Sequence, residues 1–364
     1  MSEVIDSIEI APDTYWVGKR EPNSIFFANP YLRIFRSADA NKQISLLIDP
    51  GSSSDFAVVS AKVTALLGNL RRLSAIFINH QDPDVGTSTP ALINRFAPKA
   101  TILCSEATWR LIVHLNLPRE NFVAIDRFKR GMRLGTGHMV MPVPSPFCHF
   151  RGAVMLYDPQ TRVLFSGDLF GGLTEAGAAG IWADESDWRG MRAFHQLYMP
   201  ANQALRPVIQ QIRALDPFPE IIAPQHGRLL RGPLIHEFLE RIENLPVGLD
   251  IIDEGDESTL DGWNHVLTRV LETARMLLGP TGEFRLADAR ELEDSLDFSS
   301  GEARITDIGR WTLGKIVEHL CRGEPTQVAH PIKFEAIAAA EELGLPAPDI
   351  GIEAESDDSH TGLF

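Results

Sequence analysis

One short segment constrains this chain more than any other. An apolar run, Ser74–Asn79, has the length and composition of a buried strand and leads directly into His80-Gln81-Asp82-Pro83-Asp84. Ligand-capable side chains therefore occupy alternate positions, His80, Asp82 and Asp84, just beyond the end of that strand. A rigid strand can present such side chains together over a sheet, where a metal ion needs convergent donors. The segment predicts a metal site on a sheet-containing domain.

Three further candidate ligands follow similar apolar runs. His149 ends Pro146-Phe147-Cys148-His149, Asp168 ends Leu164-Phe165-Ser166-Gly167-Asp168, and His226 follows Ile221–Gln225. A single His or Asp in a loop is usually solvated or caps a turn, so none of the three is informative alone. Their repeated placement at strand ends is what a site built from several strands needs.

Short apolar runs alternate with helical patterns over the first 249 residues, which predicts an α/β or layered α+β domain with helices covering sheet faces. The expected helices are Ser54–Leu70, Thr87–Phe96 and Arg189–Leu215. The expected strands are Ser24–Phe35, Ile44–Ile48, Leu73–Asn79, Thr101–Cys104, Met139–Val143, Val154–Tyr157, Val163–Phe165 and Glu220–Ala223.

The charge distribution predicts a domain boundary. Of the formal charge of −15, residues 1–249 hold 25 basic and 24 acidic side chains, whereas residues 250–364 hold 9 and 25. The change falls at Asn244–Glu257. We therefore expect a metal domain at 1–249, a helical connector module at 250–350 and an acidic, flexible tail at 351–364.

Three helices are expected in the connector module. The first has an apolar face from Trp263 to Leu278, with Asp261 on its N-cap side; the second spans Thr306–Arg322; the third begins at Pro331 and ends at Gly344.

Composition excludes several classes of protein. The chain has no run of ~18 apolar residues and no basic-then-apolar leader, so neither a membrane span nor a signal segment is expected. The acidic C-terminal part disfavours nucleic acid and anionic membranes as partners. Three widely spaced cysteines, Cys104, Cys148 and Cys321, form no disulfide framework and favour a reducing, cytoplasmic setting.

Taken together, the motifs resemble a known family, the metallo-β-lactamase fold in its flavodiiron and oxygen-binding diiron branch. The resemblance covers about residues 10–245 and implies an αββα sandwich followed by a small, mostly helical module. It is carried by Tyr15-Trp16-Val17-Gly18, Asn29-Pro30-Tyr31-Leu32, HQDPD at His80–Asp84, LFSGDLFGG at Leu164–Gly172, HQLYMPAN at His195–Asn202 and PQHG at Pro224–Gly227.

The resemblance implies a ligand set for two non-haem iron ions. One iron would be held by His80, Asp82 and His149, the second by Asp84 and His226, with the Asp168 carboxylate bridging the pair. The sequence departs twice from the HxExDH motif of this branch: Asp82 replaces Glu, and Val85 replaces the last His, which removes one possible donor from the second site. Three imidazoles and three carboxylates form a mixed donor set that favours iron or manganese over zinc, and the resemblance makes iron the expected metal, with manganese or zinc less expected.

Two aromatic side chains are candidates for the surroundings of the metals. Tyr198 could donate a hydrogen bond to a metal-bound oxygen or simply pack in a helix, and Trp182 could form a wall of the pocket or serve the core. We interpret Cys148 as a small buried hydrophobic residue rather than a redox partner.

Three functions remain open: an oxygen-responsive sensor, which we favour; an oxygen or nitric oxide reductase; and a dinuclear hydrolase of phosphodiesterase type. A reductase would need an external donor, because no phosphate loop for a flavin follows residue 250. Asp358-Ser359-His360-Thr361-Gly362-Leu363 resembles the start of a GGDEF-type diguanylate cyclase domain. We therefore expect the input part of a cyclic di-GMP signalling protein, binding dioxygen or nitric oxide as a homodimer, with a possible output domain after it. No catalytic residue is assigned.

Overall fold

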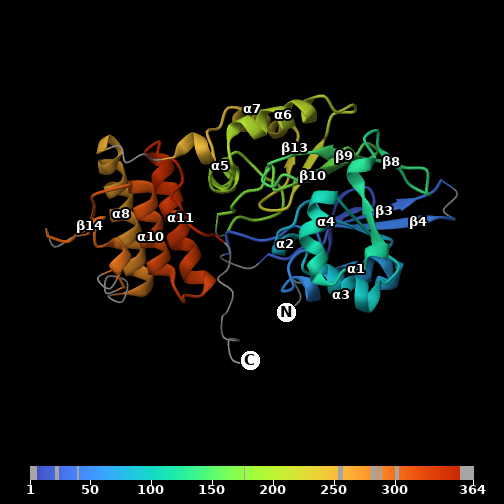
Figure 1. The fold of residues 1–364 in the computed structure, drawn as a ribbon, viewed down its shortest axis with the longest axis horizontal. Coiled ribbons are helices and arrows are strands. Elements are labelled where there is room, and N and C mark those ends of the chain that lie inside the picture. The colour runs from blue at the N-terminus through green and yellow to red at the C-terminus, as the bar shows by residue number, and fades with distance from the viewer. Residues whose placement is uncertain are drawn as a thin grey trace.

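The computed structural model describes residues 6–20, 24–38, 41–175, 177–252, 257–279, 285–286, 289–299 and 303–352. Figure 1 shows two sheets stacked between helical layers, with the C-terminal helices grouped to one side. The predicted αββα sandwich with a helical C-terminal part is confirmed.

The first sheet contains seven strands in sequence order. Its β1–β4 portion is antiparallel and its β4–β7 portion is parallel. The strands are β1 (Ile8–Ala11), β2 (Thr14–Trp16), β3 (Tyr31–Arg36), β4 (Gln43–Ile48), β5 (Ala75–Phe77), β6 (Thr101–Cys104) and β7 (Phe122–Ala124).

The second sheet has the order β13-β12-β11-β10-β9-β8, and β11 and β12 are its one parallel pair among the described strands. Its strands are β8 (Met132–Arg133), β9 (Met139–Pro144), β10 (Val154–Asp158), β11 (Val163–Gly167), β12 (Ile221–Pro224) and β13 (Leu230–Arg231).

Alternation along the strands divides the apolar residues between layers. In β4, Leu46 and Ile48 point into the core between the two sheets, whereas Leu47 faces the helices outside the first sheet. That outer face is covered by α1 (Phe56–Leu67), α3 (Thr89–Ala91) with the following π-turn Leu92–Phe96, and α4 (Glu106–Ile112). The short α2 (Pro83–Gly86) lies at its edge.

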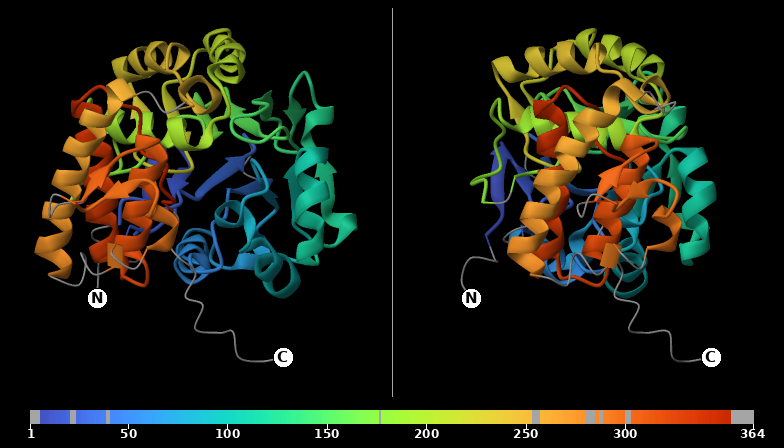
Figure 2. Two further views of the ribbon diagram at one scale, coloured as in Figure 1. Left: turned by 60° about the vertical axis from the view of Figure 1, so that its left-hand side comes forward. Right: turned by 90° about the vertical axis from the view of Figure 1, so that its left-hand side faces the viewer.

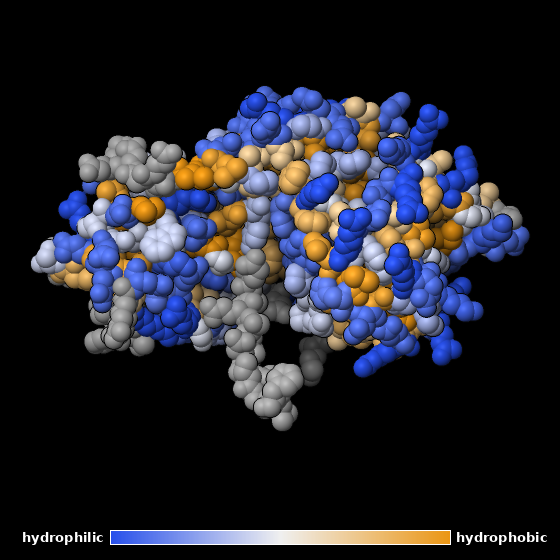
Figure 3. Space-filling view, viewed as in Figure 1, coloured by the Kyte–Doolittle hydropathy of each residue, from blue (hydrophilic) through white to orange (hydrophobic). Residues whose placement is uncertain are grey.

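The second sheet is covered by α5 (Asp187–Tyr198), α6 (Asn202–Arg213) and α7 (Pro233–Glu243). The outer surface of this layer is hydrophilic, as the blue atoms at the top of Figure 3 show, while its inner side supplies Leu205, Ile209 and Phe238 to the core.

The C-terminal part is built on α8 (Glu257–Leu278), α10 (Gly309–Cys321) and α11 (Thr326–Glu342), with a small hairpin of β14 (Leu296–Asp297) and β15 (Arg304–Ile305). Its apolar residues continue the core beneath α5–α7. Both views in Figure 2 place these helices against the sandwich.

Several expected elements differ from the structure. The strand expected at Ser24–Phe35 begins only at Tyr31, because Pro30 lacks an N–H group and the Asn29 side chain is committed to backbone carbonyls. The single helix expected at Arg189–Leu215 is two helices, since Pro200 disfavours helical backbone at Met199.

The C-terminal helices also differ in their bounds. Asp261 lies inside α8 rather than at its N-cap, because that helix already begins at Glu257. Pro331 lies inside α11 and does not begin it, because the helix starts one turn earlier, after Pro325. From residue 353 onward the expected acidic tail, with the GGDEF-like stretch, lies outside the described residues.

Among the described residues, no helix has both the length and the apolar character needed to span a bilayer. Cys104, Cys148 and Cys321 are buried and unpaired with one another.

Candidate metal centre

The six predicted ligands lie at one edge of the sandwich, because each follows a strand or begins a short helix there. His80 and Asp82 lie in the loop after β5, and Asp84 is in the first turn of α2. The other three lie beyond strands of the second sheet: His149 follows β9, Asp168 follows β11 directly, and His226 follows β12. Because β11 and β12 are parallel, their carboxyl ends meet at the same edge.

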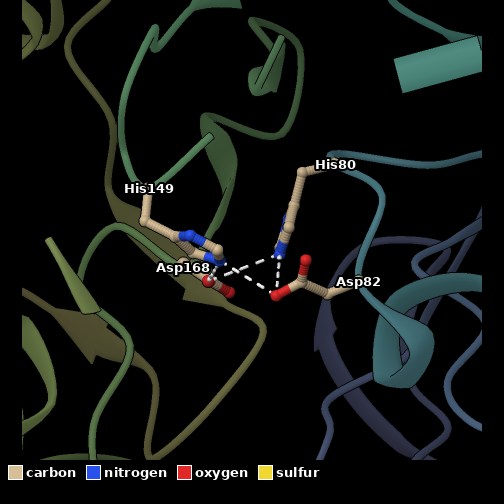
Figure 4. Close-up of side chains that lie close together, drawn as sticks. All are labelled: His80, Asp82, His149 and Asp168. Atoms are coloured by element: carbon tan, nitrogen blue, oxygen red, sulfur yellow. Dashed lines mark hydrogen bonds and ion pairs between the residues drawn. The ribbon is translucent and has the colours of Figure 1, made fainter. Parts of the chain in front are cut away.

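Four of these side chains converge in one cluster, His80, Asp82, His149 and Asp168, whose donor atoms all lie within 4.8 Å of one another (Figure 4). Nε2 of His149 lies 2.9 Å from Oδ2 of Asp82 and 3.1 Å from Oδ2 of Asp168. Nε2 of His80 lies 3.5 Å and 3.4 Å from the same two oxygens.

The other two predicted ligands form a second, sparser half. Nε2 of His226 lies 3.2 Å from Oδ2 of Asp84 and 3.6 Å from Oδ1 of Asp168. Asp168 therefore directs one carboxylate oxygen to each half. Val85, which occupies the motif position of a histidine, is fully buried and offers no side-chain donor.

Neighbouring groups fix which nitrogen of each histidine faces the centre. The His80 ring at Nδ1 lies 3.0 Å from Oδ1 of Asn79, and the His226 ring at Nδ1 lies 3.0 Å from the carbonyl oxygen of Phe27. With Nδ1–H donating to these oxygens, Nε2 of each ring is left as the ligand atom.

The donor set fits a metal ion. Nε2 of His80 and Oδ1 of Asp168 are buried and have no hydrogen-bond partner. Buried polar atoms are rarely left unpaired, so each such atom needs an explanation. A metal ion in each half would satisfy them, His80 in the first half and Oδ1 of Asp168 in the second.

The clustered charges shift the pKa values of the ligands strongly. Burial would lower the pKa of His149, but its hydrogen bonds to Asp168 and Asp82 outweigh burial and raise it to about 10. Burial is likewise outweighed at His226, where Asp84 raises the pKa to about 9. Burial raises the pKa of Asp168, yet the surrounding imidazoles lower it to about 2. Protons on the histidines therefore occupy the place that a cation would take.

Three residues beneath the ligands were missed by sequence reasoning. The buried Asp49 accepts a hydrogen bond of 2.8 Å from the Asn79 backbone N–H, and burial raises the pKa of Asp49 to about 7. The Asn79 side chain donates to the carbonyl of Val154 at 2.7 Å. Gly167 packs against Asn79 so closely that a Cβ would lie 2.2 Å from Asn79 Cγ. Asp49 follows the apolar run Ile44–Ile48, so the strand-end pattern could have found it; the other two have no such signal.

His195 holds the loop after Asp168. Its Nδ1–H donates to Met191 O at 2.7 Å and its Nε2 accepts from Phe170 N–H at 3.2 Å. Burial lowers the pKa of His195 to about 4, which keeps the ring neutral.

The two aromatic candidates have different surroundings. The ring centroid of Tyr198 is 6.1 Å from that of His149. Trp182 stacks under the guanidinium of Arg231 at 4.2 Å, and its backbone pairs with Leu229. Cys148 is fully buried beside His149, and burial raises the pKa of its thiol to about 12.

Similarity to known proteins agrees with a metal centre of this kind. A family model described as "ODP family beta lactamase" matches residues 26–227, more than half of the chain. The chain belongs to the ODP family. Among solved structures, this ODP-family chain resembles one described as "Peroxy diiron species of chemotaxis sensor ODP", with 26% identity and a TM-score of 0.54 over 68% of this chain and 97% of that one. The apo state of chemotaxis sensor ODP from T. denticola matches at 26% identity and a TM-score of 0.56, covering 68% of this chain and 96% of that one.

Curated relatives are larger flavoproteins. The "Putative diflavin flavoprotein A 3" of Synechocystis sp. is 28% identical over 56% of this chain and 33% of its own length. The "Anaerobic nitric oxide reductase flavorubredoxin" of Aliivibrio salmonicida is 23% identical over 65% of this chain and 50% of its own length. This chain thus spans a third to a half of the relatives it matches.

Proposed function

We propose that this protein is a non-haem diiron, oxygen-binding sensory module. The observation that carries the proposal is the orientation of Asp168, whose Oδ2 lies 3.1 Å from His149 Nε2 while its Oδ1 lies 3.6 Å from His226 Nε2. A carboxylate with one oxygen toward each set of donors suits a bridge between two ions. The diiron centre described for the chemotaxis sensor ODP supports the same assignment.

The spacing of the donors supports metal binding at both halves. Metal–ligand bonds of roughly 2.0–2.2 Å place neighbouring donors about 3 Å apart around one ion. The donor pairs of the first half, 2.9–3.5 Å apart, and the 3.2 Å pair of His226 and Asp84 lie near this value. We assign His80, Asp82 and His149 to one iron, Asp84 and His226 to the other, and Asp168 to both.

Two reduced irons bound here would supply the electrons for binding dioxygen or nitric oxide. The protein's contribution is a largely buried, mixed His/Asp donor set beside a cavity of about 620 Å³. Asp84 borders this cavity with Phe26 and Phe27, and most of the remaining lining is polar, including Lys19, Asp55 and Ser52–Ser54. Because Val85 supplies no donor, the second ion would keep a position open toward an exogenous ligand.

Tyr198 and Trp182 are part of this proposal. Tyr198, whose ring centroid lies 6.1 Å from that of His149, would donate a hydrogen bond to bound oxygen. Trp182 would act further out, as a wall held by Arg231.

We also propose a signalling context. The C-terminal helices would pass changes at the centre to an output, and the matches at Asp358, Thr361, Gly362 and Leu363 support cyclic di-GMP signalling. A cytoplasmic homodimer is the form we infer for such a protein. The three cysteines are buried and form no disulfide with one another, which agrees with a reducing compartment. Sequencing the gene beyond Phe364 tests the signalling context, since an output domain other than a cyclase would contradict it.

The test of the sensor proposal is spectroscopic. The protein is purified aerobically, its metals are counted, and it is reduced without oxygen before oxygen is readmitted. About two irons per chain and a visible band that appears and disappears with oxygen are expected. Two zincs, no such band and turnover of a phosphodiester would refute the sensor and favour the hydrolase.

A reductase is the second candidate, favoured by the similarity to flavorubredoxins named as nitric oxide reductases. It predicts rapid consumption of oxygen or nitric oxide once an external electron donor is added. A sensor instead binds the gas and turns over slowly under the same conditions.

A further inference from the structure

The second half of the metal centre is held by a segment that also touches the C-terminal helices. We call Ser24–Asn29 the linking segment; it precedes β3 and is largely irregular. His226 donates from Nδ1 to the carbonyl oxygen of Phe27, and its ring stacks on Phe26 with centroids 4.3 Å apart and planes at 19°. Ala28 pairs with His226 through an isolated β-bridge. The orientation of the His226 ring and the backbone of this segment therefore depend on each other.

The other end of the linking segment contacts α11. The backbone N–H of Ile25 donates a hydrogen bond of 3.0 Å to Nδ1 of His330, which lies on α11 and is 3% exposed. Ile25 is fully buried in the same apolar core as Ile332 of α11. In Figure 1, α11 is the C-terminal helix nearest the sandwich.

A shared cavity strengthens this connection. The cavity of about 620 Å³ beside the second half is bordered by the ligand Asp84, by Phe26 and Phe27 of the linking segment, and by Thr326 and His330 of α11. The first turns of α11 thus form one wall of the cavity next to the metal centre, although Asp84 and His330 are far apart in the sequence.

The C-terminal helices are held to the rest of the protein by separate contacts as well. Arg192 of α5 donates to the carbonyl oxygen of Leu345 at 2.9 Å, and Gln196 accepts from the Ala347 N–H at 2.9 Å. These contacts lie beyond the C-terminal end of α11 and attach the module independently of the linking segment.

We propose that the linking segment couples the occupancy of the second metal position to the packing of α11, through His226, the backbone of residues 25–27 and His330. The inference rests on the proposed metal centre. Metal binding at Nε2 fixes the orientation of the His226 ring and, with it, the hydrogen bond from Nδ1 to the carbonyl oxygen of Phe27. That restrains the Ile25 N–H, which is the donor to His330. Because coupling is reciprocal, loss of the His330 contact weakens binding of the second ion by the same factor as metal strengthens α11 packing.

Hydrogen exchange of the full chain, with and without metal, tests the coupling. Fe²⁺ under anaerobic conditions and Zn²⁺ are the probes, and bound ions are counted on the same samples. Loading should slow exchange of the Ile25 amide and of the amides in the N-terminal half of α11 by about fivefold or more, the lower end of typical coupling. Unchanged exchange in α11 at full loading overturns the proposal.

Two substitutions of His330 distinguish a loss of coupling from a general loss of structure. In His330→Leu the acceptor is lost, so the metal-dependent change in α11 should fall below about twofold and binding of the second ion should weaken. His330→Asn places an amide oxygen near the position of Nδ1 and should retain most of the effect. Equal behaviour of the two variants overturns the assigned role of the hydrogen bond.

Glu335→Gln serves as the control for α11 itself. Glu335 forms an ion pair with Arg269 of α8 at 2.7 Å, so this variant perturbs the helical packing without touching the linking segment. It should raise exchange in α11 equally with and without metal, which leaves the metal-dependent ratio unchanged. If neither probe ion binds, the ion count shows that the proposed metal centre has failed, and the coupling falls with it. Two bound ions without a response in α11 refute the coupling alone.

Discussion

Gly167 offers the sharpest test of how the first half of the metal centre is supported. It precedes Asp168 directly, has a φ of +61°, and leaves no room for a Cβ, which would lie 2.2 Å from Cγ of the buried Asn79. In Gly167→Ala, the left-handed backbone costs roughly 1–2 kcal/mol. Displacing the Asn79 side chain also breaks its hydrogen bonds to Val154 and His80, worth roughly 0.5–1.5 kcal/mol each. We expect the free energy of unfolding to fall by about 2–5 kcal/mol.

Urea unfolding of the metal-free protein measures this loss, and a metal titration measures its effect on the site. Freed from Asn79, His80 should bind its metal about 10- to 100-fold more weakly, as for other losses of a partner to a ligand histidine. Gly68→Ala is the matched control, because Gly68 has a φ of +78° at the end of α1 but no atom within 4 Å of the added Cβ. It should lose only the backbone cost and keep normal metal affinity. Equal losses of stability and unchanged metal binding in both variants would refute the packing argument.

Three other predictions follow from the same contacts. Asp168→Ala should bind at most one metal ion per chain by elemental analysis; retention of two would contradict the bridge. The pKa values of His149 and His226, about 10 and 9, exceed the ordinary 6.5, so their ion pairs stabilise the metal-free protein fully below pH 6.5 and this stability is lost as pH rises through 9–10. Metal must displace these protons, so calorimetric titrations should show proton release and an affinity that rises with pH from about 6.5 to 9; a flat profile would count against the site. Finally, Asp158→Ala leaves the buried Arg33 without its carboxylate partner at 2.7 Å and should cost about 3–5 kcal/mol of stability in urea unfolding, whereas a loss below 1 kcal/mol would show that the pair is solvated.

The positions of the ligands could be predicted from the sequence, because the end of a strand is marked by a short local pattern. Each of the six candidates follows an apolar run or begins a short helix, and parallel or neighbouring strands bring such positions to one edge. The same reasoning extends to Asp49, which stands after an apolar run in the same way.

The structural features that could not be predicted from the sequence depend on contacts between distant segments. The fit of Gly167 against Asn79 and the pairing of His226 with Phe27 arise only when both sheets are assembled. The predicted start of α11 was wrong for a related reason. The burial of α11 and its packing on α8 outweigh the preference of Pro331 for the first turn of a helix. The contact from Ile25 to His330 joins residues 305 positions apart, and no local pattern encodes it.

The Mössbauer spectrum of the ⁵⁷Fe-loaded, oxygen-exposed protein tests the central claim most directly, because it reports both the number of iron sites and whether they interact. Two iron environments of equal area, coupled into a diamagnetic pair through a bridge at Asp168, are the predicted result. A single paramagnetic ferric site, with the second position empty or filled by zinc, would contradict the diiron assignment.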